Sequence, residues 1–150
     1  MILDIGCGNN KHNMAIGMDK RNIEGIDIMA DAEHMPYPFK DKTFNIIIMN
    51  HLLEHIKPWL SIDVINQCWQ LLVDFGILII KVPYAPSHRY YQDPTHCNPC
   101  NETTFEYFDS DYKLWGIYKP LPWKILKLEY NSENDIEVIL QRRNNNGTYN

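Results

Sequence analysis

The sequence predicts one α/β domain built on a doubly wound, mostly parallel sheet, with a shortened first half and a C-terminal antiparallel hairpin. Three observations support this prediction. Short apolar runs follow one another along the first half of the chain, and each ends at glycine or at a polar residue. A helical pattern then separates two buried strands, the order typical of parallel sheets with right-handed crossovers. Two final apolar runs flank a polar turn, as in a hairpin.

The early strands are expected at residues 2–5, 15–19, 26–30 and 44–50. The last of these contains an unbroken run of isoleucines, which suits burial on both faces of the sheet, so it is expected at the centre. Residues 6–14 are fewer than a helical crossover normally needs. A loop or a single turn is therefore expected between the first two strands.

In the second half, apolar residues at helical spacing predict a helix over residues 59–73, with Gly76 marking its exit. A buried strand is expected at residues 77–82. The polar and aromatic segment from Pro83 to about Asn101 is long enough to be a functional loop.

The rest of the chain predicts a short helix and the terminal hairpin. Thr103 or Thr104 is expected to cap a helix that runs through Asp109. The hairpin strands are expected at residues 123–130 and 136–141, joined by asparagine, serine and aspartate residues.

Size and composition exclude several classes of protein. A chain of 150 residues matches one domain, expected at residues 1–143 with a polar tail at 144–150. The mean hydropathy of -0.39 and the short apolar runs argue against a membrane protein.

The N-terminus does not read as a signal peptide, so a cytoplasmic protein with reduced cysteines is expected. The net charge of -5 opposes nucleic-acid binding, and Arg142 and Arg143 are expected in a solvated tail.

Polar residues follow four successive predicted strands, at the edge where open α/β sheets bind ligands. The first strand leads into a Gly-x-Gly turn, in which absent side chains let a ligand approach the backbone. An acid ends the second strand, where a carboxylate can accept both hydroxyls of a ribose. The residues expected to bind a ligand at this edge are Asp4, Gly6, Gly8, Asp19, Asp31, Ala32, Asn50, His51 and Glu54.

This pattern resembles the class I S-adenosylmethionine-dependent methyltransferases, and most closely their small type 11 branch. The likeness covers roughly residues 1–110. It rests on Asp4-Ile5-Gly6-Cys7-Gly8, Asp19, Asp31-Ala32-Glu33, His51-Leu52-Leu53-Glu54-His55, Gly76-Ile77-Leu78-Ile79-Ile80 and Asp93-Pro94-Thr95-His96. The resemblance implies a Rossmann-like fold, S-adenosylmethionine as cofactor and methyl transfer as activity.

The same resemblance implies roles for the polar residues. Asp4, Gly6 and Gly8 would line the methionine half of the cofactor, Asp19 the ribose, and Asp31 with Ala32 the adenine. Asn50, His51 and Glu54 would lie beside the cofactor or the acceptor. Asparagine replaces the third glycine of the usual nucleotide fingerprint, which argues against a nicotinamide enzyme.

His55 and His96 are the candidate catalytic residues, since imidazole titrates near working pH. Each has a structural alternative, His55 as a helix-start residue and His96 as the anchor of a loop turn. Tyr84, Tyr91 and Asp93 are candidates for acceptor binding. His96, Cys97 and Cys100 have the look of zinc ligands, but no fourth ligand is evident, so no metal is predicted.

The sequence thus favours a methyltransferase that acts on a small molecule or on a modified biopolymer end, with a small molecule preferred. The alternatives are a catalytically silent S-adenosylmethionine-binding partner subunit and a module for another adenine nucleotide. Because the sequence shows no helices before the first strand, where related enzymes usually carry helices that cover the cofactor, we expect a cofactor crevice open on one side. A second copy of the chain, a partner subunit or the substrate would close it.

Overall fold

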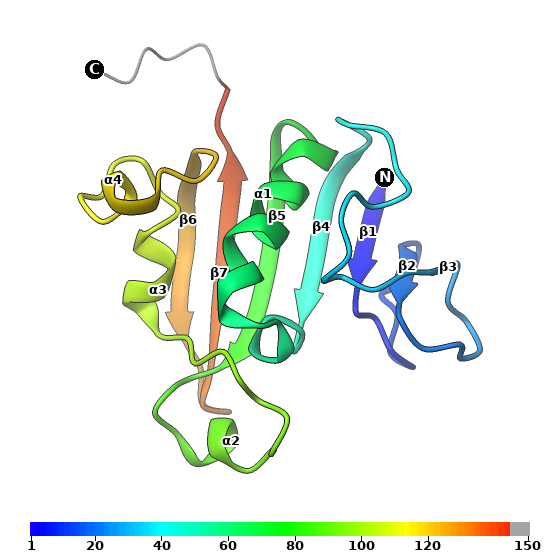
Figure 1. Cartoon of the computed structure of the whole chain (residues 1–150), viewed down its shortest axis with the longest axis horizontal. Coiled ribbons are helices and arrows are strands. Elements are labelled where there is room, and N and C mark those ends of the chain that lie inside the picture. The colour runs from blue at the N-terminus through cyan, green and yellow to red at the C-terminus, as the bar shows by residue number, and fades with distance from the viewer. Residues whose placement is uncertain (145–150) are drawn as a thin grey trace.

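The computed structural model describes residues 1–144 and forms one mixed sheet with the strand order β3-β2-β1-β4-β5-β7-β6 (Figure 1). The strands from β3 to β5 are parallel, whereas β7 runs antiparallel to both β5 and β6. The predicted fold class is therefore confirmed. The strands are β1 (Ile2–Ile5), β2 (Ile16–Asp19), β3 (Ile28–Met29), β4 (Phe44–Asn50), β5 (Leu72–Pro83), β6 (Trp123–Tyr130) and β7 (Asp135–Arg142).

The helices are short apart from the one that joins β4 to β5. This helix, α1, buries one apolar face against the sheet, with Cys68 Sγ 3.8 Å from Met49 Sδ of β4. Leu78 and Ile80 of β5 are fully buried in the same core. The helices are α1 (Ser61–Leu71), α2 (His88–Tyr91), α3 (Glu102–Glu106) and α4 (Trp115–Tyr118), with 3-10 turns at Leu53–His55 and Pro58–Leu60.

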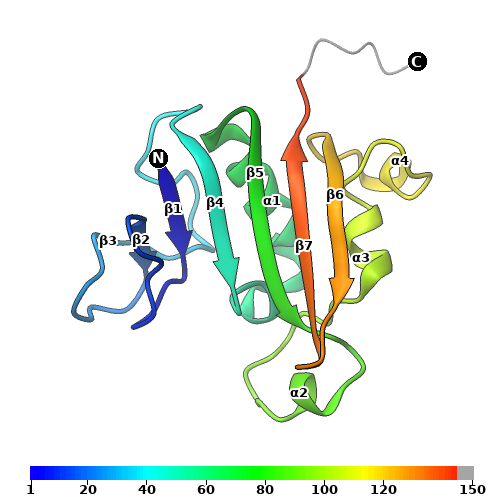
Figure 2. The ribbon, with the colours of Figure 1, turned by 180° about the vertical axis from the view of Figure 1, so that it is seen from behind.

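The helices α1, α3 and α4 lie on one face of the sheet, and the opposite face of the described chain carries no helix (Figures 1 and 2). The loops that join β1 to β2 and β2 to β3 contain turns instead, which confirms the loop predicted at residues 6–14. Alternate residues of a strand point to opposite faces. Ile46, Ile77, Ile79 and Ile139 therefore face the helix-free side, where they are only partly buried.

The boundary between α1 and β5 differs from the prediction. The helix ends at Leu71 and the strand begins at once with Leu72, which pairs with Phe44. Gly76 lies inside the strand, within an irregularity where the pairing register shifts between Phe44 and Ile46. A bulge explains the error, because a glycine inside an extended run marks a bulge as readily as the end of a helix.

The cap of α3 is also different from the prediction. Asn101 is the N-cap, and its side chain accepts a hydrogen bond from the Thr104 backbone N–H. The Thr104 hydroxyl in turn accepts from the Asn101 backbone N–H at 3.0 Å. Thr104 is thus the third residue of a capping box rather than the cap itself.

The prediction of a solvated basic tail is wrong for Arg142 and Arg143. Arg142 lies in β7 with 5% of its side chain exposed, and its guanidinium stacks 3.7 Å from the ring centroid of Trp69. Arg143 pairs with Asp109 and Asp111. The described chain therefore uses both cations to hold its C-terminal strand, and all the proposed tail except Asn144 lies outside the described residues.

Candidate functional site

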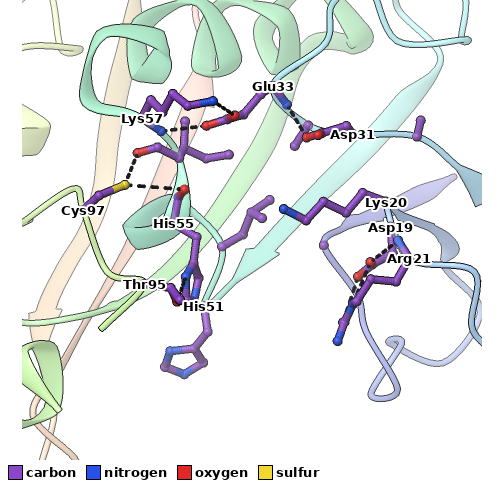
Figure 3. A pocket seen from close by; sticks show the side chains of 15 residues that line it. Asp19, Lys20, Arg21, Asp31, Glu33, His51, His55, Lys57, Thr95 and Cys97 are labelled. Atoms are coloured by element: carbon purple, nitrogen blue, oxygen red, sulfur yellow. Dashed lines mark hydrogen bonds and ion pairs between the residues drawn. The ribbon is translucent and has the colours of Figure 1, made fainter. Parts of the chain in front are cut away.

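A cavity of about 570 Å³ opens at the carboxyl ends of the parallel strands (Figure 3). Its wall comes from the turn after β1, the end of β2, the loop after β3, the segment after β4, and the loop between β5 and α3. The lining residues are Gly6, Asp19, Lys20, Arg21, Ala30, Asp31, Ala32, Glu33, His51, Leu52, His55, Ile56, Lys57, Thr95 and Cys97. The parallel strands thus bring together, around one cavity, residues that are far apart in the sequence.

The turn after β1 brings bare backbone to the cavity. Gly6 has a left-handed backbone with φ of 69°, and a Cβ there would lie 2.8 Å from Cδ1 of Leu52. Asp4 does not line the cavity; it is buried under the turn and accepts a hydrogen bond from the His12 N–H at 2.7 Å. Burial raises the pKa of the Asp4 carboxyl above its ordinary value, although the His12 N–H opposes this effect. Asp4 therefore holds the shape of the turn.

The Asp19 carboxylate is 5% exposed and is held by two segments of the chain. Oδ2 accepts from the Gly8 N–H at 2.9 Å, and Oδ1 accepts from the Arg21 N–H at 2.9 Å. The Arg21 guanidinium donates to both oxygens (Figure 3). Burial alone would raise the pKa of Asp19, but these hydrogen bonds together hold it below the ordinary value. Asp19 is thus ionised at neutral pH, and Gly8 serves to fix it.

The loop after β3 forms the opposite wall. Asp31 accepts from the Glu33 N–H at 3.0 Å, and the Ala32 carbonyl accepts from the Tyr37 hydroxyl at 2.7 Å. The Glu33 carboxylate accepts two hydrogen bonds from Lys57, one from its backbone N–H at 2.8 Å and one from its side-chain ammonium at 2.6 Å. This pair ties the loop after β3 to the segment after β4 (Figure 3).

His51 follows β4 in a left-handed conformation, with φ of 51°. Such a conformation is uncommon for a non-glycine residue, although histidine adopts it more readily than most, and strained residues of this kind cluster at functional sites as well as in turns. Its Nδ1 lies 3.3 Å from Oε1 of Glu54, and its Nε2 lies 3.6 Å from Oδ2 of Asp135. Asp135 is fully buried and also pairs with Arg89 and Lys81. His51 is therefore oriented by two buried carboxylates.

A hydrogen-bonded chain links the loop between β5 and α3 to His55. The Thr95 hydroxyl donates to Oδ1 of Asp93 at 2.7 Å and lies 3.0 Å from Nδ1 of His55. His96 packs its ring against His55, with ring centroids 4.7 Å apart, and its Nδ1 lies 2.7 Å from the Tyr90 carbonyl oxygen. Hydrogen bonds from Thr95 lower the pKa of Asp93.

The remaining predicted site residues lie elsewhere. Asn50 is exposed at the end of β4, and Tyr91 has 71% of its surface exposed. Tyr84 lines a second cavity of about 520 Å³ and packs its ring against Tyr130. The structure therefore groups neither tyrosine with the cavity at the strand ends. Glu54 lies behind the wall, fully buried.

Sequence reasoning missed the cations of the cavity, Lys20, Arg21 and Lys57. Lys20 and Arg21 directly follow Asp19, so a rule that examined the two residues after each strand end would have found them. Lys57 has no such signal, because its place depends on the ion pair with Glu33. Cys97 also lines the cavity, whereas Cys100 is buried in the core.

The comparison that decides the family is a sequence match. A family profile described as "Methyltransferase domain" matches residues 1–115. The chain belongs to the class I S-adenosylmethionine-dependent methyltransferases. The resemblance of the strand-end motifs is thus confirmed, and the cofactor of this methyltransferase is S-adenosylmethionine. A search for related curated proteins found no match.

Solved structures share the fold of this methyltransferase over most of its length. An S-adenosylmethionine-dependent methyltransferase from Archaeoglobus fulgidus is 19% identical with a TM-score of 0.74, covering 94% of this chain and 85% of that chain. One from Methanosarcina mazei is 15% identical with a TM-score of 0.67, covering 95% and 92%. The 1,6-didemethyltoxoflavin-N1-methyltransferase of Burkholderia thailandensis, solved with 1,6-didemethyltoxoflavin and S-adenosylhomocysteine, is 12% identical with a TM-score of 0.69, covering 95% and 71%. Identities this low show the fold alone.

None of the helices within residues 1–144 is long and apolar enough to cross a membrane.

Proposed function

We propose that this chain transfers the methyl group of S-adenosylmethionine to a small molecule, and that both bind in the cavity at the strand ends. The observation that supports the proposal most strongly is the continuity of that cavity. Gly6, Asp19 and Ala32 line the same space as His51 and His55. Cofactor-binding and acceptor-facing groups are thereby within reach of one another.

The wall near β1, β2 and β3 suits the cofactor. Gly6 lines this wall with a left-handed backbone that glycine adopts without strain, so no side chain of its own stands between its backbone and a ligand. The ionised Asp19 can accept hydrogen bonds from vicinal ribose hydroxyls. Asp31 and Ala32 lie where backbone and carboxylate groups can meet the adenine ring. We therefore assign these residues to cofactor binding.

His55 and His96 are the proposed catalytic pair. S-adenosylmethionine supplies a methyl group already activated on a sulfonium, so the protein's task is to position and deprotonate the acceptor. His55 lines the cavity, and His96 packs directly against it. His51, held between Glu54 and Asp135, is proposed to position the acceptor from the end of β4.

A small acceptor fits both the volume and the charge of the site. The cavity of about 570 Å³ falls in the range of small-molecule sites, and part of it is needed for the cofactor. The net charge of -5 disfavours a phosphate backbone as acceptor. Asp93 is kept as a candidate acceptor contact, since it lies next to Thr95 at the edge of the cavity.

The experiment is incubation of the purified chain with methyl-labelled S-adenosylmethionine and two extract fractions, one of small molecules and one of macromolecules. We expect label in a product of the small-molecule fraction. His55→Gln should lower the rate at least tenfold while the affinity for S-adenosylhomocysteine stays unchanged. Label only in the macromolecular fraction would contradict the proposed acceptor class.

A catalytically silent cofactor-binding subunit is the second candidate, and one observation favours it. The face of the sheet opposite α1 carries partly exposed isoleucines and no helix within residues 1–144, so another polypeptide could cover it. That covering chain would be a second copy or a different partner. Binding of S-adenosylhomocysteine without any methyl transfer, together with a stable complex, would favour this candidate.

A further inference from the structure

Glu54, His55 and His96 meet at one point next to the cavity. The carboxylate and the two imidazoles each offer one ligand atom, and these atoms lie within 4.8 Å of one another. Glu54 and His55 come from the 3-10 turn after β4, and His96 comes from the loop between β5 and α3. The Cys97 and Asn98 N–H groups both donate to the Glu54 carbonyl, which fixes this loop against the turn.

The Glu54 carboxylate is the feature that calls for an explanation. The residue is 1% exposed, yet neither carboxylate oxygen accepts a hydrogen bond from any described residue. Its ion-pair neighbour is His51, with Nδ1 at 3.3 Å from Oε1. A buried carboxylate without hydrogen bonds is costly. Such a group therefore calls for a partner, for example a bound ion.

The hydrogen bonds of the two histidines use Nδ1 on each ring and leave Nε2 without a hydrogen bond, and Nε2 of His96 lies 3.8 Å from Oδ2 of Asp93. The Thr95 hydroxyl gives its only proton to Asp93, so it accepts from Nδ1–H of His55. The Tyr90 carbonyl can only accept, so Nδ1 of His96 is also a donor. In the neutral rings Nε2 therefore carries the lone pair in both His55 and His96.

We propose that Glu54, His55 and His96 bind a divalent transition-metal ion. Two imidazoles and one carboxylate are a donor set typical of zinc and related ions in open catalytic sites. Histidine ligands usually donate their other ring N–H to a carboxylate, a backbone carbonyl or a water, and His96 donates to the Tyr90 carbonyl, whereas His55 donates to the Thr95 hydroxyl. Three protein ligands would leave positions free for water or substrate, and one of the three, His55, also lines the cavity.

This site is distinct from the cysteine motif that the sequence singled out. No group of three potential ligands within residues 1–144 includes Cys97 or Cys100. The Cys100 thiol donates to the Asn98 carbonyl, and burial raises its pKa to about 12, so it is a poor ligand. His96 is the one member of that motif that reaches the metal cluster.

The role of the ion rests on the proposed function: with their Nε2 atoms on the ion, His55 and His96 would act in methyl transfer by holding the ion rather than as the base that accepts the proton. A bound divalent cation favours the deprotonated form of a coordinated hydroxyl. An acceptor with an oxygen donor would thus be held and activated beside the methyl group. Metal binding itself requires only the three side chains, so it can be tested without an acceptor or a cofactor.

The test is titration of tag-free, metal-stripped protein with Co²⁺, followed by visible absorption, and with Zn²⁺ by calorimetry. We expect one equivalent of Co²⁺ to give d–d bands that Zn²⁺ abolishes. Glu54→Gln and His96→Gln should each weaken binding at least about tenfold. The control is His88→Gln, which removes an exposed histidine outside the cluster and should leave the affinity unchanged.

Circular dichroism of each variant checks that it is folded, and Zn²⁺ should raise the melting temperature of the wild type more than that of Glu54→Gln. Absence of binding at millimolar Co²⁺, or equal affinity in wild type and Glu54→Gln, would overturn the proposal and leave Glu54 as the partner of His51. Titration with S-adenosylhomocysteine in parallel separates the two proposals, because its failure would count against the cofactor site alone.

Discussion

The carboxylate of Asp19 has about four lone-pair sites, and the structure supplies four donors to them. Two donors are backbone N–H groups, from Gly8 and Arg21, which cannot move without deforming the turn. The other two belong to the Arg21 guanidinium, whose side chain is 59% exposed. A ribose can therefore reach Asp19 only when the Arg21 side chain swings away into solvent.

Arg21→Ala should consequently bind S-adenosylhomocysteine more tightly. An exposed ion pair contributes about 0.2–1 kcal/mol, so the expected gain is about 1.4- to fivefold. Lys20→Ala is the matched control, because it removes the same charge from the same cavity without touching the Asp19 carboxylate. Calorimetric titration of both variants measures the effect. Weaker binding by Arg21→Ala would mean that Arg21 contacts the cofactor.

The lowered pKa of Asp19 also predicts how stability depends on pH. A carboxyl whose pKa is lower in the folded than in the unfolded state contributes stability above the unfolded value of 3.8. That contribution is lost as the pH falls through the folded pKa. The wild type should therefore exceed Asp19→Asn in free energy of unfolding at pH 7, and the difference should shrink between about pH 5 and 3. Urea denaturation across this range measures it; a constant difference would contradict the assignment.

At the scale of single residues, the sequence predicted the acids better than their partners. Asp19 and Asp31 were found because strand ends of a parallel sheet converge. The histidines His51 and His55 were found for the same reason. Arg21 and Lys57 were missed, since a long side chain can bind a carboxylate from many positions and spacing does not reveal which.

At the scale of elements, α3 depends on its capping box more than on its length. The helix spans five residues, too few to be stable without tertiary support. Phe105 anchors it in the core, and the reciprocal hydrogen bonds of the capping box satisfy the backbone N–H groups of Asn101 and Thr104. This element closes the far end of the loop that carries His96.

Asn101→Ala should therefore lower the free energy of unfolding by about 1 kcal/mol, as expected for the loss of an N-cap. Thr103→Ala is the control, because that neighbour is exposed and takes no part in the capping box. Urea denaturation of the two variants compares them. Equal effects would show that the capping box contributes nothing to stability.

Strands with a clear pattern were predicted to within a residue or two, and β4 and β6 match their predicted ranges. Boundaries that depend on tertiary contacts were not predicted. The bulge in β5 around Gly76 exists because the strand pairs with β4 at two registers, and no local pattern encodes that pairing. Arg142 looked like part of a tail because its cation–π contact with Trp69 joins residues far apart in the chain.

At the scale of the whole molecule, the sheet is covered by helices on one face and open on the other (Figure 2). The cavity lies at the edge of this sheet, where the loops after successive parallel strands meet. The open face reflects linkers between β1, β2, β3 and β4 that hold turns in place of helices, and the sequence predicted only the first of these, at residues 6–14. The cavity and the open face are therefore products of the same topology.

The most direct test of the account is calorimetric titration of the purified chain with S-adenosylhomocysteine, beside Asp19→Ala. The account predicts one binding site in the wild type and at least tenfold weaker binding in the variant, because the ribose would lose charge-assisted hydrogen bonds. Absence of binding by the folded wild type, or equal affinity in Asp19→Ala, would contradict the assignment of the cavity at the strand ends as the cofactor site.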